Sequence, residues 1–275
     1  MRAIRSAREA VAILHRLDRS GPTDLLSAQN ALALTLRSQN RLDEAEPIYR
    51  SILTIQRRTL PEGHSDLAAT LNNLAYLLRT REAYGEAEPL YREALSILQS
   101  VYGRTHPDAL MLMSNLAFVL HRQGNIDETE QVLREKIELT RQRYGSDHWR
   151  TGSALVSGVG RLLMKENDCA RALPALRNGL SIWERGLGAD HPWTAQARGM
   201  VGICLMDQQR PGAAAALDAS YAHFQEALRV NRPGLQLYMF DHLAQLSSQY
   251  GLTDRAAAYR ELLERGKALQ KAPAG

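Results

Sequence analysis

Four histidines recur at nearly constant intervals, and imidazole is the commonest metal ligand among side chains. His64, His106 and His148 are 42 residues apart, and His191 follows after 43. Zinc holds imidazole nitrogens at about 2.0–2.1 Å, whereas the axes of packed helices lie about 8–10 Å apart. Histidines one interval apart therefore cannot share an ion if each interval is a helical unit. We interpret them as residues of loops and helix starts, and we expect no metal site.

The cysteines and the catalytic signatures predict no chemistry either. Cys169 and Cys204 form no CxxC pair, so we expect buried or bystander thiols and a reducing compartment. The segment SGVGRLLMK (157–165) lacks the third glycine and the preceding strand of a dinucleotide-binding loop. The signatures GxSxG, Walker A, HExxH and those of kinases are absent. The chain is therefore predicted not to be an enzyme and to need no cofactor.

Composition is that of an ordinary globular protein. Apolar residues make up 44% of the 275 residues, charged residues 23%, and the net charge is +4. This charge balance does not call for a nucleic acid or a membrane surface as partner. No apolar run reaches the roughly 18 residues that a membrane-spanning helix needs. We predict a cytoplasmic location.

The elements that position the histidines are repeated along the chain. YGEAEPLYREALSI (84–97) repeats LDEAEPIYRSILTI (42–55), and GRTHPDALMLMSNLAF (103–118) repeats PEGHSDLAATLNNLAY (61–76). Small residues recur in six successive units, at intervals of 42 or 43 residues. They are Ala33, Ala75, Ala117, Gly160, Gly202 and Ala244, and twelve residues after each Ala45, Ala87, Thr129, Ala172, Ala214 and Ala256.

Each unit reads as two amphipathic helices. Leu71, Leu74, Ala75 and Leu78 follow the spacing i, i+3, i+4, i+7, which places them on one helical face. Prolines at positions 47, 89 and 174 are expected in the first turn of the second helix, where a missing N–H is tolerated. In the fourth unit, Gly152, Gly158 and Gly160 weaken the first helix, and the unit before it carries one inserted residue near 149–151. We expect this unit to be the least stable.

This pattern resembles the tetratricopeptide repeat, in the 42-residue form typical of the kinesin light chain. The similarity extends from residue 23 to about 270, and Tyr49 and Tyr91 match the aromatic residue of the second helix. Asp218 and Arg260 stand where Tyr91 would align, and Leu71 replaces the family's tryptophan. The resemblance implies an all-α, right-handed α-solenoid of stacked antiparallel helix pairs.

The same alignment divides the chain into three parts. Residues 1–20 would be a half repeat with a single helix, 21–271 a six-unit array, and 272–275 a disordered tail. The half repeat is either a cap or the remnant of a longer protein. Its apolar residues would lack a helix to pack on, so we expect weak self-association through this edge; they are Ala7, Ala10, Val11 and Leu14.

A polar stripe runs along the first helices. On a helical wheel Asn72, Tyr76 and Arg79 flank the apolar face, while Asn73 points to the other side. In tetratricopeptide arrays this flank faces a concave groove, which implies peptide-binding residues, although ordinary solvated side chains are the alternative. The predicted groove residues are Asn30, Arg37, Asn72, Tyr76, Arg79, Ser114, Phe118, His121, Arg122, Arg161 and Lys165. Acids gather instead on the second helices and predict an acidic outer side: Glu44, Glu46, Glu86, Glu88, Glu93, Glu128 and Glu130.

These features predict a protein–protein interaction scaffold or adaptor. Its partner would be an extended, acidic peptide segment with an aromatic or aliphatic anchor. The lysines of the carboxylate clamp found in some family members are absent from the first three units, so that mode is not expected here. The alternative is a sensory or docking tail detached from a bacterial signalling protein, either a Ser/Thr kinase or a transcription regulator. That alternative depends on analogy alone.

Overall fold

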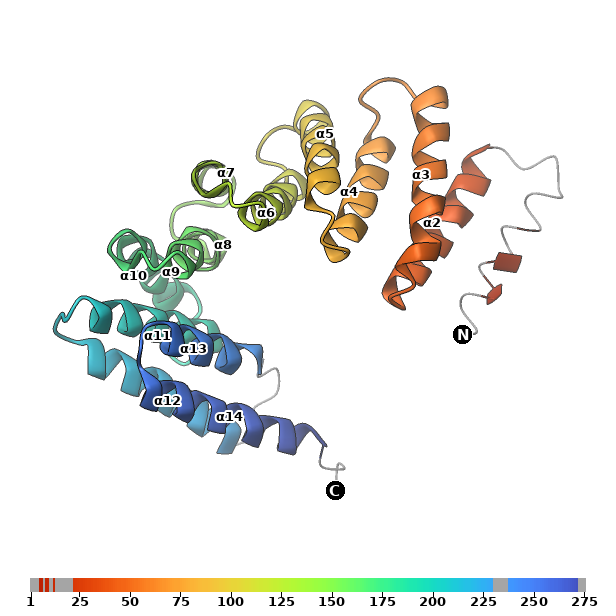
Figure 1. Ribbon diagram of the computed structural model, residues 1–275. Helices are drawn as coiled ribbons and strands as arrows, with labels where there is room; N and C mark the ends of the chain where they lie inside the picture. The colour runs from red at the N-terminus through yellow and green to blue at the C-terminus, as the bar shows by residue number, and fades with distance from the viewer. Residues whose placement is uncertain (1–4, 7, 10–11, 13–21, 230–236, 272–275) are drawn as a thin grey trace. The chain divides into compact units, whose positions relative to one another are not determined.

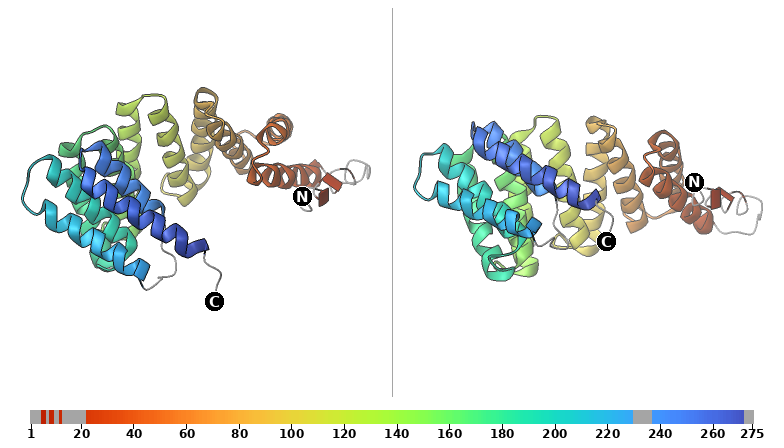
Figure 2. Two further views of the ribbon diagram at one scale, coloured as in Figure 1. Left: turned by 60° about the horizontal axis from the view of Figure 1, so that its bottom comes forward. Right: turned by 90° about the horizontal axis from the view of Figure 1, so that it is seen from below.

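The computed structural model describes residues 5–6, 8–9, 12, 22–229 and 237–271, and every regular element in these ranges is helical (Figure 1). The chain divides into two compact units, Met1–Leu139 and Thr140–Gly275. Within each unit the helices form successive antiparallel pairs, which Figure 2 shows from two other sides. The prediction of an all-α solenoid of helix pairs is confirmed.

The first unit contains three pairs. They are α2 (Pro22–Ser38) with α3 (Leu42–Thr59), α4 (Ser65–Thr80) with α5 (Tyr84–Tyr102), and α6 (Pro107–Arg122) with the start of α7 (Ile126–Tyr144). Ala33, Ala75 and Ala87 are completely or almost completely buried, and so are Tyr49 and Tyr91. Small side chains at these positions let paired helices approach closely, and the tyrosines fill the space between pairs.

The periodic histidines begin the first helices, as predicted. Nδ1 of His64, His106, His148 and His191 accepts a hydrogen bond from the backbone N–H two residues later. This bond satisfies one of the donors that a helix start leaves without a partner. Among the described residues no group of His, Cys, Asp or Glu is arranged to hold a metal ion.

The second unit continues the pattern with an irregular first helix. Its helices are α8 (Trp149–Ser153), the π-helix η1 (Ala154–Gly160), α9 (Arg161–Lys165), α10 (Cys169–Gly186), α11 (Pro192–Asp207), α12 (Ala213–Arg229), α13 (Tyr238–Gln249) and α14 (Thr253–Lys271). A π-helical turn holds one more residue than an α-helical turn. The extra residue of the 43-residue interval is therefore absorbed in η1, a few residues after the predicted 149–151.

The glycines of this irregular helix have a packing role, which the repeat of small residues predicted for Gly160 but not for Gly152. A Cβ at Gly152 would lie 2.6 Å from Trp183, and one at Gly160 would lie 2.5 Å from Leu176. Both contacts are closer than real Cβ atoms make. The glycines therefore allow α10 to approach, in addition to lowering helix propensity.

Of the expectation of buried or bystander thiols, the burial is confirmed and the unpaired state is wrong. Cys169 and Cys204 form a disulfide, with their Cα atoms 5.0 Å apart and a sequence separation of 35. Cys169 is the first residue of α10, and Cys204 lies in α11. Both are buried. The bond joins the second helix of the fourth pair to the first helix of the fifth.

Three details of helix register also differ. The second helices begin earlier than predicted, so that Pro47, Pro89 and Pro174 lie inside them rather than in the first turn. In α12 the buried small residue is Ala213, while Ala214 is exposed. Leu217 and Tyr259, each one residue before the aligned Asp218 and Arg260, are the buried side chains.

The predicted half repeat and tail lie largely outside the described residues, and so do Ala7, Ala10, Val11 and Leu14. Arg8 is described and pairs with Glu44 at 2.5 Å. None of the helices in the described ranges combines the length and the hydropathy that a membrane span requires.

Candidate functional site

An alternating row of arginines and aromatic rings runs across the first helices of the first unit. Cζ of Arg37 on α2 lies 4.8 Å from the ring centroid of Tyr76 on α4. Cζ of Arg79 lies between two rings, 4.4 Å from the centroid of Tyr76 and 4.9 Å from that of Phe118 on α6. Cation–π attraction holds guanidinium groups over such rings, most strongly where water is partly excluded.

The row ends at Tyr84, the first residue of α5. Its ring meets Phe118 edge-on at 6.4 Å. Arg122 lies over Tyr84 at 5.3 Å, and its Nε donates a hydrogen bond of 3.0 Å to the tyrosine hydroxyl. We call Arg37, Tyr76, Arg79, Phe118, Tyr84 and Arg122 the Arg–aromatic ladder. Tyr84 was not predicted as a site residue, because it begins a second helix rather than continuing the stripe on the first helices.

Asparagines of the following repeat orient two of these arginines. Nη1 of Arg37 donates to Oδ1 of Asn73 at 3.2 Å, and Nη1 of Arg79 donates to Oδ1 of Asn115 at 3.1 Å. The amide of Asn115 also donates to Oδ1 of Asn72 at 3.5 Å, so Asn72 has a neighbour within the protein. Asn73 on α4 thus orients Arg37, and Asn115 on α6 orients Arg79 while it contacts Asn72.

The ladder combines positive charge with exposed aromatic surface. Tyr76 and Phe118 keep 38% and 45% of their area exposed. Among the described residues no carboxylate pairs with Arg37 or Arg79, whereas Arg122 lies 3.5 Å from Glu82. Each guanidinium has five donors, so Arg37 and Arg79 retain N–H groups that an external acceptor can use.

The other predicted residues of this unit are occupied differently. Ser114 donates to the carbonyl oxygen of Leu110 and accepts from Nζ of Lys136 at 2.5 Å. Oδ1 of Asn30 is buried and finds no hydrogen-bond partner among the described residues. His121 is half-buried at the end of α6. These three residues do not join the ladder.

Buried tyrosines accompany the ladder. Burial raises the pKa of Tyr91 to about 12, although the positive charge of Arg79 acts in the opposite direction. Burial likewise raises the pKa of Tyr49, against the charge of Arg37. The positive charges of the two arginines thus act on the buried tyrosines.

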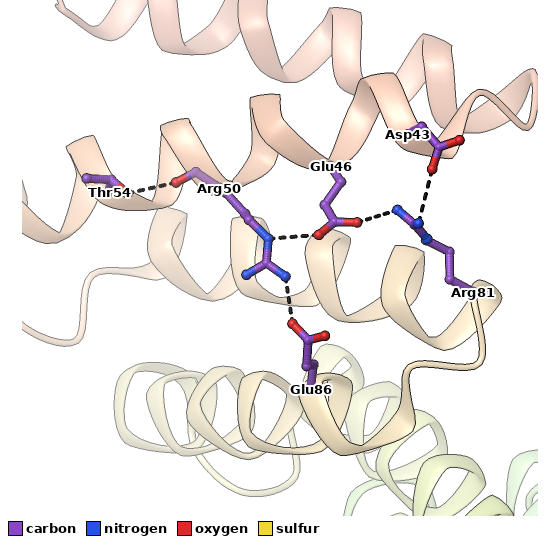
Figure 3. A network of polar contacts seen from close by, with 6 residues as sticks. All are labelled: Asp43, Glu46, Arg50, Thr54, Arg81 and Glu86. Carbon is purple, nitrogen blue, oxygen red and sulfur yellow. Dashed lines mark hydrogen bonds and ion pairs between the residues drawn. The ribbon is translucent and has the colours of Figure 1, made fainter.

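The second helices carry a network of ion pairs rather than free acids (Figure 3). Glu46 accepts from Arg50 of its own helix at 2.8 Å and from Arg81 of the next repeat at 2.6 Å. Arg50 also donates to Glu86 at 2.7 Å, and Arg81 lies 3.1 Å from Asp43. Each of these acids is thus paired with an arginine of a neighbouring repeat.

The same pairing recurs along the unit, which corrects the predicted acidic outer side. Arg92 pairs with Glu88 of its own helix and with Glu128 of the next repeat. Arg8–Glu44 and Arg57–Glu93 also join different helices, and Arg134–Glu130 is a pair within α7. Arginine neutralises these carboxylates, so the second helices of the first unit do not present an acidic surface.

Arg161 and Lys165 lie on α9 in the second compact unit. Arg161 keeps exposed surface, yet partial desolvation of its guanidinium by nearby protein atoms lowers its pKa, and Tyr238 on α13 acts in the opposite direction. The positive charges of Arg161 and Lys165 both act on His242 of α13. They belong to a separate polar cluster, which the sequence did not distinguish from the stripe of the first unit.

Comparison with known proteins identifies the repeat. Models of the tetratricopeptide repeat match residues 24–100, 66–142 and 157–192, together more than half of the chain. No curated protein sequence matches it.

Several solved structures have a similar fold. BtubC (BKLC) from P. vanneervenii is 21% identical, covers 86% of this chain and 92% of its own, and gives a TM-score of 0.66. Repeats of a protein assigned as a kinesin light chain in Podosopora anserina are 20% identical over 75% of this chain and 97% of that one, with a TM-score of 0.64. RapI in its apo form is 14% identical over 98% and 92%, with a TM-score of 0.67. At these identities the likeness shows the fold alone.

Proposed function

The chain belongs to the tetratricopeptide repeat family, and we propose that its Arg–aromatic ladder binds an extended, acidic segment of a protein partner. Members of this family are generally non-catalytic interaction scaffolds, which supports a protein partner. The ladder indicates which chemical groups the partner should carry, because it offers cations and exposed rings side by side.

One observation carries the proposal. Arg37 and Arg79 are oriented by amide oxygens and aromatic rings, and no carboxylate of the described residues neutralises them. A guanidinium held in this way loses little conformational entropy when it binds, and it can engage a carboxylate through two parallel hydrogen bonds. Tyr76 and Phe118 provide apolar surface beside each carboxylate for an aromatic or aliphatic anchor.

The spacing fits an extended chain. Neighbouring packed helices lie about 8–10 Å apart, and three residues of extended chain span about 10 Å. Acidic residues three positions apart would therefore meet Arg37 and Arg79. Arg122 contributes less, because Glu82 and the hydroxyl of Tyr84 already engage it. The predicted peptide contact of Asn72 also weakens, since Asn115 is its neighbour.

A peptide selection on the full chain tests this proposal. Random peptides displayed on phage are selected, and the affinities of the enriched peptides are measured by fluorescence anisotropy at two salt concentrations. We expect enrichment of Asp or Glu at a spacing of three residues around an apolar anchor. Arg79→Gln should weaken binding at least tenfold, as expected for a desolvated charge pair.

Two further variants make the test specific. Asn115→Asp keeps an acceptor for Arg79 but adds a negative charge beside it, so it should weaken acidic peptides about as much as Arg79→Gln. Arg58→Gln removes the same charge from an exposed position of α3 and should leave affinity unchanged. Enriched peptides without acids, or an affinity that Arg79→Gln does not alter, would refute the acidic-peptide function.

A further inference from the structure

A row of aromatic rings lies where the second unit begins, between the end of α7 and the start of α8. Tyr144 is the last residue of α7, and its ring stacks on the imidazole of His148 with the two centroids 5.0 Å apart. The centroid of His148 lies 5.6 Å from that of Trp149, and Trp149 lies 5.6 Å from Trp193 on α11. All four side chains are half-buried, so each keeps part of its surface accessible.

Contacts in the interior fix this row in place. Trp183 on α10 is 1% exposed, and its ring centroid lies 5.7 Å from that of Trp193. Nε1 of Trp183 donates to the carbonyl oxygen of Trp149 at 2.8 Å. Nδ1 of His148 accepts from the backbone N–H of Arg150 at 3.2 Å. The rings are thus held by the protein itself and form a support for the charged side chains beside them.

Two arginines lie over these rings. Cζ of Arg150 is 4.9 Å from the ring centroid of Tyr144 and 4.6 Å from that of Trp149, so one guanidinium contacts both rings. Cζ of Arg143 lies 5.5 Å from the centroid of the same tyrosine. Both arginines are exposed. We call Arg143, Tyr144, His148, Trp149 and Arg150 the α7–α8 cluster.

Among the described residues no carboxylate neutralises Arg143 or Arg150. The acid nearest to them in sequence, Asp147, pairs with Arg185 instead, at 2.5 Å. Other arginines of the second unit are paired in the same way: Arg171–Asp168, Arg198–Glu184 and Arg255–Asp218. The α7–α8 cluster therefore presents two exposed positive charges that the chain leaves uncompensated.

We propose that the α7–α8 cluster binds a short run of consecutive acidic residues in a protein partner. Both guanidinium carbons lie within 5.5 Å of one ring centroid, so an extended segment of about three residues, at about 3.3 Å each, is long enough to reach both. A guanidinium that lies over a ring is held by cation–π attraction. It keeps its in-plane N–H donors, which can engage a carboxylate through two parallel hydrogen bonds.

The charge pattern favours such a segment over a nucleic acid. A nucleic-acid backbone repeats its charge along its length and needs a continuous basic surface. The ion pair between Asp147 and Arg185 interrupts the positive charge within the cluster's own stretch of sequence. The expected ligand also differs from that of the Arg–aromatic ladder, because its acids are consecutive and it needs no apolar anchor. The site lies in the second unit and does not depend on the proposed role of the ladder.

Tryptophan fluorescence reports on this site. Trp149 belongs to the α7–α8 cluster, Trp183 and Trp193 adjoin it, and these are the three tryptophans of the chain, so the ladder contains none. The full chain is titrated with acetyl-Gly-Glu-Glu-Glu-Gly-amide. Acetyl-Gly-Gln-Gln-Gln-Gly-amide at the same ionic strength is the uncharged control. We expect a saturable change of emission with the acidic peptide alone, and added salt should weaken its binding.

Variants decide whether the two arginines supply the charge. Arg150→Gln should weaken binding of the acidic peptide about fivefold, the upper end for an exposed charge pair, and combining it with Arg143→Gln should abolish the change of emission. Both positions are exposed, and an unchanged urea midpoint checks that the variants fold. Arg177→Gln removes a charge from an exposed position of α10, and Arg79→Gln removes one from the ladder; both should leave the titration unchanged.

Four results would overturn the proposal. They are no saturable change with the acidic peptide, an equal change with the uncharged peptide, an affinity that Arg150→Gln does not alter, and an equal loss of affinity in Arg177→Gln. A thymidine tetranucleotide, which carries three phosphate charges like the peptide, tests the remaining class of partner. Tighter binding of the tetranucleotide than of the peptide would assign the cluster to nucleic acid and would also overturn the proposal.

Discussion

Adding one methyl group at Gly152 should destabilise the second unit, although alanine is the better helix former. The new Cβ would lie 2.6 Å from both Cδ1 and Nε1 of Trp183 and 3.2 Å from the backbone oxygen of Gly179. Trp183 has no free space to move into, since it is 1% exposed and its Nε1 donates to the carbonyl oxygen of Trp149 at 2.8 Å. The indole must therefore shift or give up this hydrogen bond.

The magnitudes predict the sign. Replacing glycine with alanine in a helix gains up to about 1 kcal/mol of helix propensity. Overpacking a filled core costs about 1–3 kcal/mol, and loss of the indole hydrogen bond costs a further ~1 kcal/mol. Gly152→Ala should thus lower the free energy of unfolding by about 2 kcal/mol. Gly186→Ala is the matched control, because the nearest atom to its Cβ would be a backbone oxygen at 3.9 Å.

Urea unfolding followed by tryptophan fluorescence is the suitable assay. The three tryptophans, Trp149, Trp183 and Trp193, all belong to the second unit and report on it directly. Gly186→Ala should leave the midpoint unchanged or raise it slightly, while Gly152→Ala lowers it. If Gly152→Ala raises the midpoint as much as its control does, the close approach of α10 is not what selects glycine here.

Three further predictions concern other contacts. Reducing the Cys169–Cys204 disulfide, which closes a loop of 35 residues, should lower stability by about 4 kcal/mol in the chain-entropy model, and unfolding of Cys169→Ala should not respond to reductant. Glu46→Gln removes the carboxylate that Arg50 and Arg81 share, although Arg50 keeps Glu86 and Arg81 keeps Asp43; it should cost about 1 kcal/mol in thermal unfolding, against about 0.5 or less for Glu93→Gln, and high salt should shrink the difference. Because the folded pKa of His242 is about 4 and its ordinary value is 6.5, the unfolded state binds more protons between these values, so stability should fall by up to about 3 kcal/mol as the pH drops through this window; His242→Gln should lose this part of the pH dependence.

The repeat could be predicted because its signal is distributed over many positions. Buried small residues such as Ala75 and Ala87 and capping histidines such as His64 recur at one interval, so that local exceptions do not hide the period. The glycines of the fourth repeat were harder to interpret. Helix propensity explains their cost, but only the position of Trp183 explains why Gly152 cannot be alanine.

The disulfide could not be predicted from spacing. Two cysteines separated by 35 residues are compatible with any distance between the thiols, and their pairing depends on which residue of α11 faces the start of α10. The His242 cluster was hidden for a similar reason. Arg161 and His242 belong to helices two pairs apart, and the repeat pattern alone does not indicate that α9 and α13 meet.

The ion pairs, in contrast, follow a rule that the sequence does contain. Arg50 and Arg92 reach an acceptor 36 residues later, six residues short of one repeat, and so do Arg37 and Arg79. An arginine side chain thus spans from one repeat to the next along both faces of the first unit. Searching for acids at this offset would have shown that the outer carboxylates are paired.

The two faces differ only in the acceptor that stands at this offset. On the second helices it is a carboxylate, as in Arg50–Glu86, and the pair is neutral. On the first helices it is an amide, as in Arg79–Asn115, which orients the guanidinium and leaves its charge in place. Asparagine is a mediocre helix former, and a carboxylate at Asn73 or Asn115 would give a stronger bond to the same arginine. The choice of an amide at both positions is therefore what keeps the Arg–aromatic ladder positively charged, as the proposed binding of an acidic partner requires.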